Sequence, residues 1–158
     1  MALQPYTVIT KPTVGNSVSK ADEGDPMVDN FTRLHTLEDQ ELKIPINGAT
    51  ALVAGDRQYD VIWTKFDGGT IVDVGAVCSV GSTSGNVVLY IKKNGTNVLT
   101  TNITIEETET SSLTATVQPV INAAVATVAK GDLLEFGVVS EGTSVTHVII
   151  VYAIRPSA

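Results

Sequence analysis

The stretch Val87-Val88-Leu89-Tyr90-Ile91-Lys92-Lys93-Asn94-Gly95-Thr96 decides the fold class of this 158-residue chain. Successive side chains of a strand point to opposite faces, so Val87, Leu89 and Ile91 are expected to share one apolar face. Asn94-Gly95 follows directly and favours a two-residue type I′ turn, because both central residues of that turn need a positive φ. We therefore predict a β-hairpin with one buried face.

The same period of two recurs on both sides of this hairpin. One buried face is predicted to consist of Val72, Val74, Ala76, Cys78 and Val80. Another is predicted to consist of Leu134, Phe136 and Val138. The last run, residues 145–154, is apolar on both faces, which fits a strand in the core as well as a strand at a subunit interface.

Turn residues separate these runs. They lie at Asp67–Gly69, Gly81–Gly85, Ala129–Asp132 and Ser140–Thr143. About eight or nine short strands fit between Ala49 and Ile154, with no helical pattern among them, which indicates an antiparallel β-sandwich. An all-β jelly roll is the leading topology for that number of strands. An immunoglobulin-like sandwich is the alternative, but the Cys…Trp…Cys spacing of that fold is missing.

The N-terminal part of the chain has a different composition. Residues 1–30 contain Pro5, Pro12 and Pro26 and a polar stretch from Gly15 to Asp25. Such a stretch buries too little apolar surface to offset its ordering entropy alone. We therefore divide the chain into an N-terminal arm and linker at 1–44 and a β-sandwich domain at 45–158. Residues 29–42 fit either a short helix or an irregular linker.

Two apolar patches flank the polar stretch of the arm. We expect them to anchor the arm to another surface, on which the arm becomes ordered. The candidate binding residues are Tyr6, Val8, Ile9, Met27, Val28 and Phe31.

The overall charge and composition exclude several classes of function. A formal charge of −7 argues against nucleic acid and against an anionic membrane surface, since both attract Lys and Arg. Cys78 is the single cysteine, so no intramolecular disulfide is expected. The start, Met1–Pro5, has neither a basic nor an apolar region, so we expect no secretory signal. Aromatic residues are scarce, which disfavours a sugar-binding surface.

The residue types needed for catalysis or metal binding do not occur in suitable groups. The two histidines, His35 and His147, have no evident nucleophile partner, and one cysteine with two isolated histidines cannot form a closed zinc site. The acidic clusters Asp22–Asp25 and Glu106–Glu109 do not match the spacing of a calcium loop. We predict no enzyme activity, no cofactor and no metal site, and we expect Cys78 to be a small buried apolar residue.

Several of these segments, taken in order, resemble a known family. They are Gly69–Val77, Lys92–Leu99, Ile103–Ile105, Ser111-Ser112 and Val128–Asp132. Their order and spacing over about residues 60–156 resemble the jelly-roll domains of virion proteins of tailed bacteriophages, including cyanophages: capsid decoration (cement) proteins, head fibres and fibre tips.

The resemblance implies a homotrimer on the outer capsid surface of the virion, made in the host cytoplasm, with the major capsid protein as its partner. It also implies that the arm clamps neighbouring capsid subunits and that the protein needs no cofactor. The alternative is a head-fibre or tail-fibre tip that binds a host receptor or glycan, because fold alone does not fix function. A carbohydrate-active enzyme or its accessory module is a third hypothesis.

Overall fold

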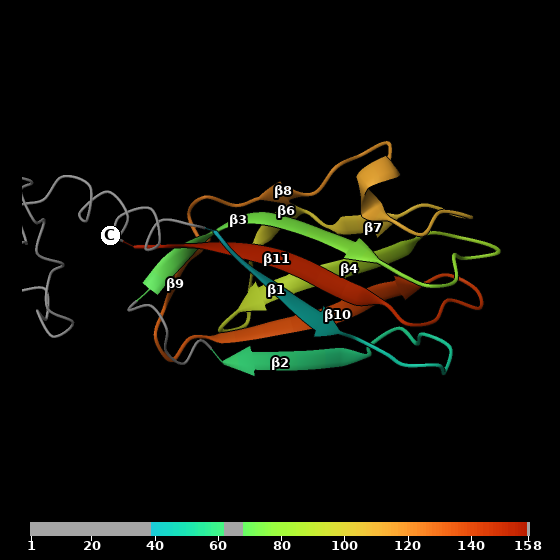
Figure 1. The fold of residues 1–158 in the computed structure, drawn as a ribbon, viewed down its shortest axis with the longest axis horizontal. Helices are drawn as coiled ribbons and strands as arrows, with labels where there is room; N and C mark the ends of the chain where they lie inside the picture. The colour runs from blue at the N-terminus through green and yellow to red at the C-terminus, as the bar shows by residue number, and fades with distance from the viewer. Residues whose placement is uncertain (1–38, 62–67, 158) are drawn as a thin grey trace, which may run out of the picture. The chain divides into compact units, whose positions relative to one another are not determined.

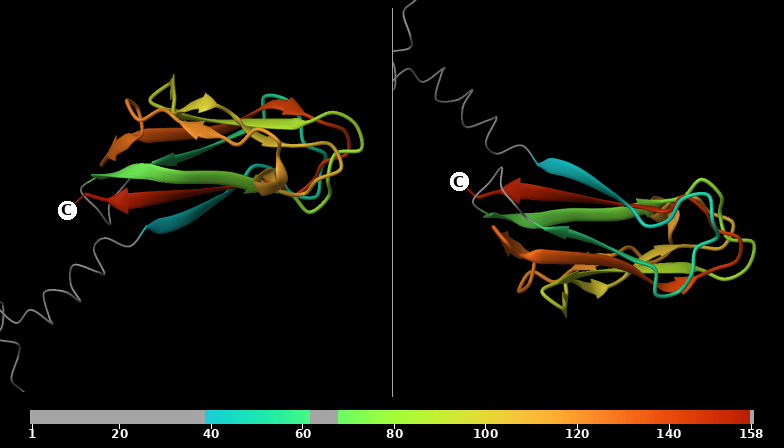
Figure 2. Two further views of the ribbon diagram at one scale, coloured as in Figure 1. Left: turned by 90° about the horizontal axis from the view of Figure 1, so that it is seen from above. Right: turned by 90° about the horizontal axis from the view of Figure 1, so that it is seen from below.

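The computed structural model describes residues 39–61 and 68–157, which form two antiparallel β-sheets packed face to face (Figures 1 and 2). The prediction of an all-β antiparallel sandwich is confirmed. Sheet A has the order β1-β11-β3-β9, and sheet B has the order β2-β10-β4-β5, with β7 also paired to β4. Strands β6 and β8 form a small separate pair.

The strands of sheet A are β1 (Gln40–Pro45), β3 (Gly68–Val77), β9 (Thr127–Ala129) and β11 (Ile149–Pro156). Those of sheet B are β2 (Arg57–Val61), β4 (Val87–Lys93), β5 (Thr96–Asn97), β7 (Ile103–Ile105) and β10 (Leu133–Glu141). The small pair consists of β6 (Leu99–Thr101) and β8 (Val120–Ile121). A 3₁₀ helix, η2 (Ser112–Thr114), lies between β7 and β8.

The strand pairs are nested along the chain. Strand β1 pairs with β11, β2 with β10, β3 with β9 and β4 with β7. Consecutive strands from β1 to β4 alternate between the two sheets, as do β9, β10 and β11. The chain therefore runs as a long antiparallel double strand that folds back and forth between the layers.

The hairpin predicted at Asn94-Gly95 is present. Strand β4 pairs with β5 through Lys93 and Thr96, which leaves Asn94 and Gly95 as the two turn residues. Their φ angles are 48° and 84°, as the type I′ turn requires. On the strand itself, Val87, Leu89 and Ile91 are fully buried, so the predicted face is confirmed.

The core lies between the sheets, and two aromatic residues mark its centre. Phe136 of β10 and Tyr152 of β11 place their ring centroids 5.0 Å apart, within the range of favourable aromatic pairs. The Tyr152 hydroxyl donates a 2.7 Å hydrogen bond to Asp60 of β2, so its polar end is satisfied. The predicted inward face of β10, including Leu134 and Val138, is confirmed.

The predicted buried face of residues 72–80 is wrong at both ends. The register between β3 and β11 shifts so that Asp73 pairs with Ala153 but Ile71 pairs with Ile154. This bulge turns Ile71 into the core, where it is 1% exposed, and leaves Val72 half-buried. Strand β3 ends at Val77, so Val80 lies in the following loop and is 47% exposed.

Sheet A also differs from the prediction at its two ends. Strand β1 begins at Gln40, within the segment that the sequence assigned to the linker, so residues 40–42 form a strand rather than a helix or an irregular linker. Strand β11 begins only at Ile149, because His147 has a φ of +53° and interrupts the extended backbone. The predicted arm anchors lie outside the described residues.

Candidate functional site

The outer face of sheet A is apolar along β11 and at the end of β3, whereas Asp73 of β3 is a charged residue beside Ala153. On β11, Ile150, Tyr152 and Ile154 are buried in the core, so Ile149, Val151 and Ala153 point outward and are only half-buried. Across the strand pair, Ile149 lies beside Val77 and Val151 beside Gly75. An antiparallel sheet with one solvated face normally carries polar residues there.

The segment around η2 lies along the edge of β3 that β9 leaves open. Cys78 donates its backbone N–H to the Thr110 carbonyl at 2.9 Å, and Val77 forms an isolated bridge with Ser111. Ser112 is 1% exposed, and its Oγ accepts a 2.9 Å hydrogen bond from the Ala76 N–H. These contacts satisfy strand donors that would otherwise form an exposed edge.

Leu113 projects from this segment into solvent. Its side chain is 80% exposed, although its backbone N–H is capped by Ser111 Oγ at 3.2 Å and the neighbouring Ser112 is buried. The Gln118 side-chain amide also donates to the Ala115 carbonyl at 2.7 Å, which closes the end of the η2 segment. The structure therefore holds a large apolar side chain in an exposed position on a well-fixed backbone.

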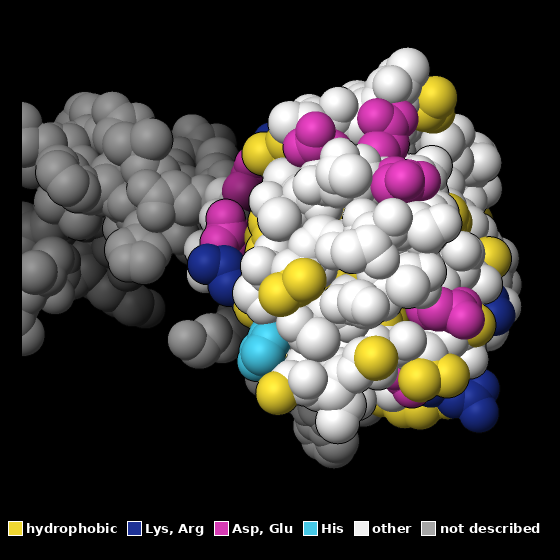
Figure 3. All heavy atoms as spheres, turned by 90° about the vertical axis from the view of Figure 1, so that its right-hand side faces the viewer, with side chains coloured by type: hydrophobic (Ala, Val, Ile, Leu, Met, Phe, Trp, Pro, Cys, Tyr) yellow, Lys and Arg dark blue, Asp and Glu magenta, His cyan; other side chains and the backbone are white. Residues whose placement is uncertain are grey.

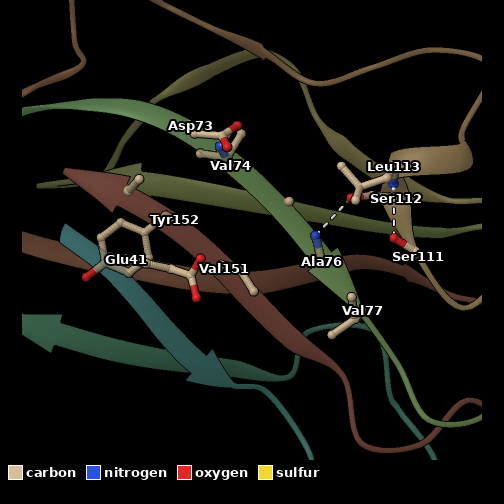
Figure 4. A pocket seen from close by; sticks show the side chains of 12 residues that line it. Glu41, Asp73, Val74, Ala76, Val77, Ser111, Ser112, Leu113, Val151 and Tyr152 are labelled. Atoms are coloured by element: carbon tan, nitrogen blue, oxygen red, sulfur yellow. Dashed lines mark hydrogen bonds between the residues drawn. The ribbon is translucent and has the colours of Figure 1, made fainter. Parts of the chain in front are cut away.

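A pocket of about 220 Å³ opens between Leu113, β3 and β11 (Figure 4). Leu113 lies on one side of β3 and Val151 on the other. Gly75 contributes no side chain to the floor, and a Cβ at this position would lie 3.3 Å from Ser112 Oγ. Two shallower hollows adjoin the pocket. One shares Val77 with it, and the other shares Leu113.

We call this surface the sheet A face. It is formed by Gly75 and Val77 of β3, Leu113 of η2, and Ile149, Val151 and Ala153 of β11.

The charges near the sheet A face are mostly paired. Asp39 accepts two hydrogen bonds from the Arg155 guanidinium, at 2.9 and 3.1 Å, and these hold the pKa of Asp39 below its usual value. Glu41 Oε1 lies 3.1 Å from Lys43 Nζ on β1. Asp73 is the remaining carboxylate at the pocket, and it accepts a hydrogen bond from its neighbour Val74 N–H. This region is close to neutral, unlike the chain as a whole.

Several acidic side chains lie at the loop end of the sandwich, which faces the viewer in Figure 3. Their carboxylates cap backbone groups of neighbouring loops: Glu107 accepts from Gly85 N at 3.0 Å and Glu106 from Thr116 N at 2.9 Å. Glu109 accepts from the Thr114 hydroxyl at 3.1 Å. In the described part of the chain no group of three His, Cys, Asp or Glu side chains is placed to hold a metal ion.

His147 and Cys78 are the histidine and the cysteine within the described ranges. The surroundings of each side chain suit a structural role. His147 is exposed, and its Nδ1 lies 3.0 Å from Ser79 Oγ. A catalytic Ser–His pair needs a third group that orients the imidazole, and none is hydrogen-bonded to this ring among the described residues. Cys78 is 8% exposed, and burial raises the pKa of its thiol, so the expectation of a buried apolar residue is confirmed.

Comparison of the chain with protein-family models, curated proteins and solved structures finds no match. Over the described ranges, no helix has the length and apolar character required to cross a membrane.

Sequence analysis did not identify the residues that build the pocket. Leu113 and Gly75 lie far apart in the chain, and neither belongs to a periodic pattern that predicts an exposed apolar site. The one available signal was the run at residues 145–154, which is apolar on both faces. Of the predicted arm residues, Tyr6, Val8, Ile9, Met27, Val28 and Phe31 lie outside the described ranges, so their role stays a prediction.

Proposed function

We propose that this chain is a virion structural protein, a capsid decoration (cement) protein that binds the outer surface of a phage head and stabilises it. The observation that supports a binding role most directly is the apolar sheet A face. A contiguous exposed apolar surface of this kind often marks a site of protein contact. The proposal includes the major capsid protein and further copies of this chain, as a homotrimer, among the partners, and no enzyme activity.

The strand order supports a jelly roll as the topology of the sandwich. In that topology two four-stranded sheets are built from nested antiparallel pairs, and here the pairs β1–β11, β2–β10, β3–β9 and β4–β7 follow that order. This architecture agrees with the resemblance to decoration and fibre proteins, although it does not by itself define the function.

The mechanism we propose is binding by several weak contacts at once. When copies associate, each additional arm binds at a high effective concentration, so avidity rises without new contacts per subunit. The part of the predicted arm that precedes β1 (Gln40–Pro45) is the proposed capsid-binding element. In it Tyr6, Val8, Ile9, Met27, Val28 and Phe31 are the proposed anchors.

The test is decoration of phage heads that lack this protein. We expect the full-length chain to bind the heads and a variant lacking residues 1–30 to remain folded but unbound. The double substitution Tyr6→Ser with Ile9→Ser should weaken binding, whereas Thr7→Ala with Thr10→Ala, in the same stretch, should not. Full occupancy of the heads by the truncated protein would exclude the arm as the capsid-binding element.

A fibre tip that binds a host receptor or glycan is the second candidate. It is favoured by the rigid loop end, where Ser82 Oγ accepts from Thr143 N at 2.9 Å and Asn86 Oδ1 accepts from Glu107 N at 3.0 Å. Fixed loops of this kind are suited to recognition. Labelling the protein on intact virions separates a decoration protein, which lies on the head, from a tail-fibre tip, and a glycan array with no hits would argue against a head-fibre tip that binds sugars.

A further inference from the structure

We propose that the sheet A face binds the same face of a second copy, with Leu113 of each copy entering the pocket above Gly75 of the other. The inference goes beyond the proposed function, because a two-fold contact of this kind joins two copies and is separate from the three-fold contacts of the proposed homotrimer.

The size of the pocket favours a side chain as its occupant. Its volume of about 220 Å³ lies below the range of about 300–1,000 Å³ that is typical of small-molecule sites. Its walls are mainly apolar, with Val77 and Val151 among them, so the matching group is an apolar side chain. A branched aliphatic residue such as leucine has this character.

The same surface supplies such a side chain. Leu113 is 80% exposed at the margin of the pocket, and Ser112 fixes its backbone to β3 through the Ala76 N–H. Because the backbone is already fixed, Leu113 loses only side-chain rotamer freedom on binding, which limits the entropic cost of association. Leu113 and the pocket lie side by side on one surface. Two copies related by a two-fold axis can therefore each insert Leu113 into the pocket of the other, which is the geometry of an isologous contact.

Strand β11 provides the remaining contact area. Its outward residues Ile149, Val151 and Ala153 form an apolar row next to the pocket. Two sheets that pack face to face lie about 10 Å apart and interdigitate such rows, as the two inner faces of this sandwich already do. A second copy would therefore give β11 the apolar covering on both faces that its sequence indicates.

The charge distribution permits this approach. A chain with a formal charge of −7 repels its own copies, and the acidic loop end would add to that repulsion. Near the sheet A face, in contrast, Asp39 is paired with Arg155 and Glu41 with Lys43. Among the described residues of this region, Asp73 is the carboxylate without an ion-pair partner, so each copy brings one net negative charge to the contact.

Sedimentation velocity of the full-length chain over a range of concentrations tests the proposal. We expect the wild-type chain to associate and Leu113→Asp to weaken association by at least about tenfold in the dissociation constant, which is about 1.4 kcal/mol. Leu113→Met, which keeps an apolar side chain, should associate like the wild type. The matched control is Val139→Asp on β10, which introduces the same charge at an apolar residue that is 54% exposed outside the sheet A face, and it should have no effect.

Three results would overturn the inference, and they differ in what they say of the proposed function. If Leu113→Asp associates like the wild type, or if Val139→Asp weakens association equally, the interface lies elsewhere and the proposed function is unaffected. If the wild-type chain is monomeric at every concentration, both this inference and the self-association in the proposed function are wrong. Binding of heads by the arm is measured separately and does not depend on any of these results.

Discussion

At the scale of single residues, the Tyr90 side chain is held on the surface of sheet B by its neighbours, and these contacts change the pKa of its hydroxyl. Its ring lies where Gly137 on the neighbouring strand leaves room, since a Cβ on Gly137 would be 2.4 Å from the Tyr90 ring. The hydroxyl donates a 2.5 Å hydrogen bond to Glu135, and Lys92 Nζ lies 4.5 Å from the ring centroid. Burial, followed by the bond to the Glu135 carboxylate, raises the pKa of Tyr90 to about 12.

This shift predicts a loss of stability in alkali. In the unfolded chain Tyr90 loses its proton near pH 10, whereas the folded chain keeps it to about pH 12. The folded state therefore binds more protons in this window, and the stabilisation, complete below pH 10, falls as pH rises through it. Urea unfolding from pH 9 to 12 should show a smaller fall for Tyr90→Phe than for the wild type. Equal falls in the two proteins would contradict this assignment.

A second residue-scale contact joins the β4–β5 turn to the β9–β10 turn. Asp132 accepts hydrogen bonds from the Ala129 N–H and from the Asn94 side-chain amide, both at 2.8 Å. Asn94 Oδ1 in turn accepts from the Leu133 N–H at 3.0 Å. The backbone bond from Ala129, followed by the bond from Asn94, lowers the pKa of the Asp132 carboxyl.

We expect Asp132→Ala to lower the free energy of unfolding by about 1–3 kcal/mol, because two bonds to a charged carboxylate are lost. A lowered pKa stabilises the fold above the unfolded value near 3.9, and this stabilisation disappears as pH falls through the lower, folded value. The difference between wild type and variant should therefore narrow below about pH 4. Thr96→Ala, on an exposed position next to the same turn, is the control and should change stability by less than about 0.5 kcal/mol.

At the scale of elements, the η2 segment connects the stability of sheet A to the proposed interface. Ser112 is the buried residue of this segment, and its hydroxyl satisfies the Ala76 N–H. Ser112→Ala leaves this donor without a partner, so we expect a loss of about 1–3 kcal/mol in the free energy of unfolding. Thr116→Ala, at an exposed position further along the segment, should have little effect in the same thermal or urea unfolding measurement.

The same variant also reports on the contact between copies. Release of Ser112 from β3 loosens the backbone that holds Leu113, so Ser112→Ala should weaken association of the chain as well as its stability. Unchanged sedimentation behaviour of a folded Ser112→Ala protein would show that Leu113 needs no such support.

Local signals in the sequence were sufficient for part of the fold. The hairpin at Asn94-Gly95 and the buried rows of β4 and β10 follow from turn chemistry and a period of two, which neighbouring residues determine. The bulge at Val72 was not predictable in this way, because it arises from the register of β3 against β11. Strand β1 was missed because its alternation is short and ends at Pro45.

The candidate site was less predictable than the fold. The η2 segment lacks a periodic pattern, and its strand-like contacts with β3 involve single residues such as Ser111. The pocket exists because tertiary folding places Leu113 beside Gly75, and no local rule contains that contact. The apolar outward row of β11 was visible in the sequence, but the choice between core and interface required knowledge of which face the sandwich covers.

At the scale of the whole molecule, the described residues of the two sheets share one hydrophobic core. The unit that includes it begins at Thr36, and its first strand, β1, starts at Gln40. Leu42 and Ile44 of β1 pack against the core from the edge of sheet A, and Asp39 is ion-paired with Arg155 of β11. Among the described residues, those that form the core and its edge strand all belong to this unit.

We accordingly expect a variant lacking residues 1–35 to unfold cooperatively at nearly the temperature of the full chain. A difference of about 4 °C or less corresponds to about 1 kcal/mol in a domain of this size, and calorimetry of the two proteins resolves it. A variant lacking residues 1–45 is the informative contrast. It removes β1, exposes the edge of β11 and uncovers the core beneath Leu42 and Ile44, so its melting temperature should fall much further. If the shorter deletion were equally damaging, the first 35 residues would be part of the core, and their proposed role as an arm for capsid binding would be wrong.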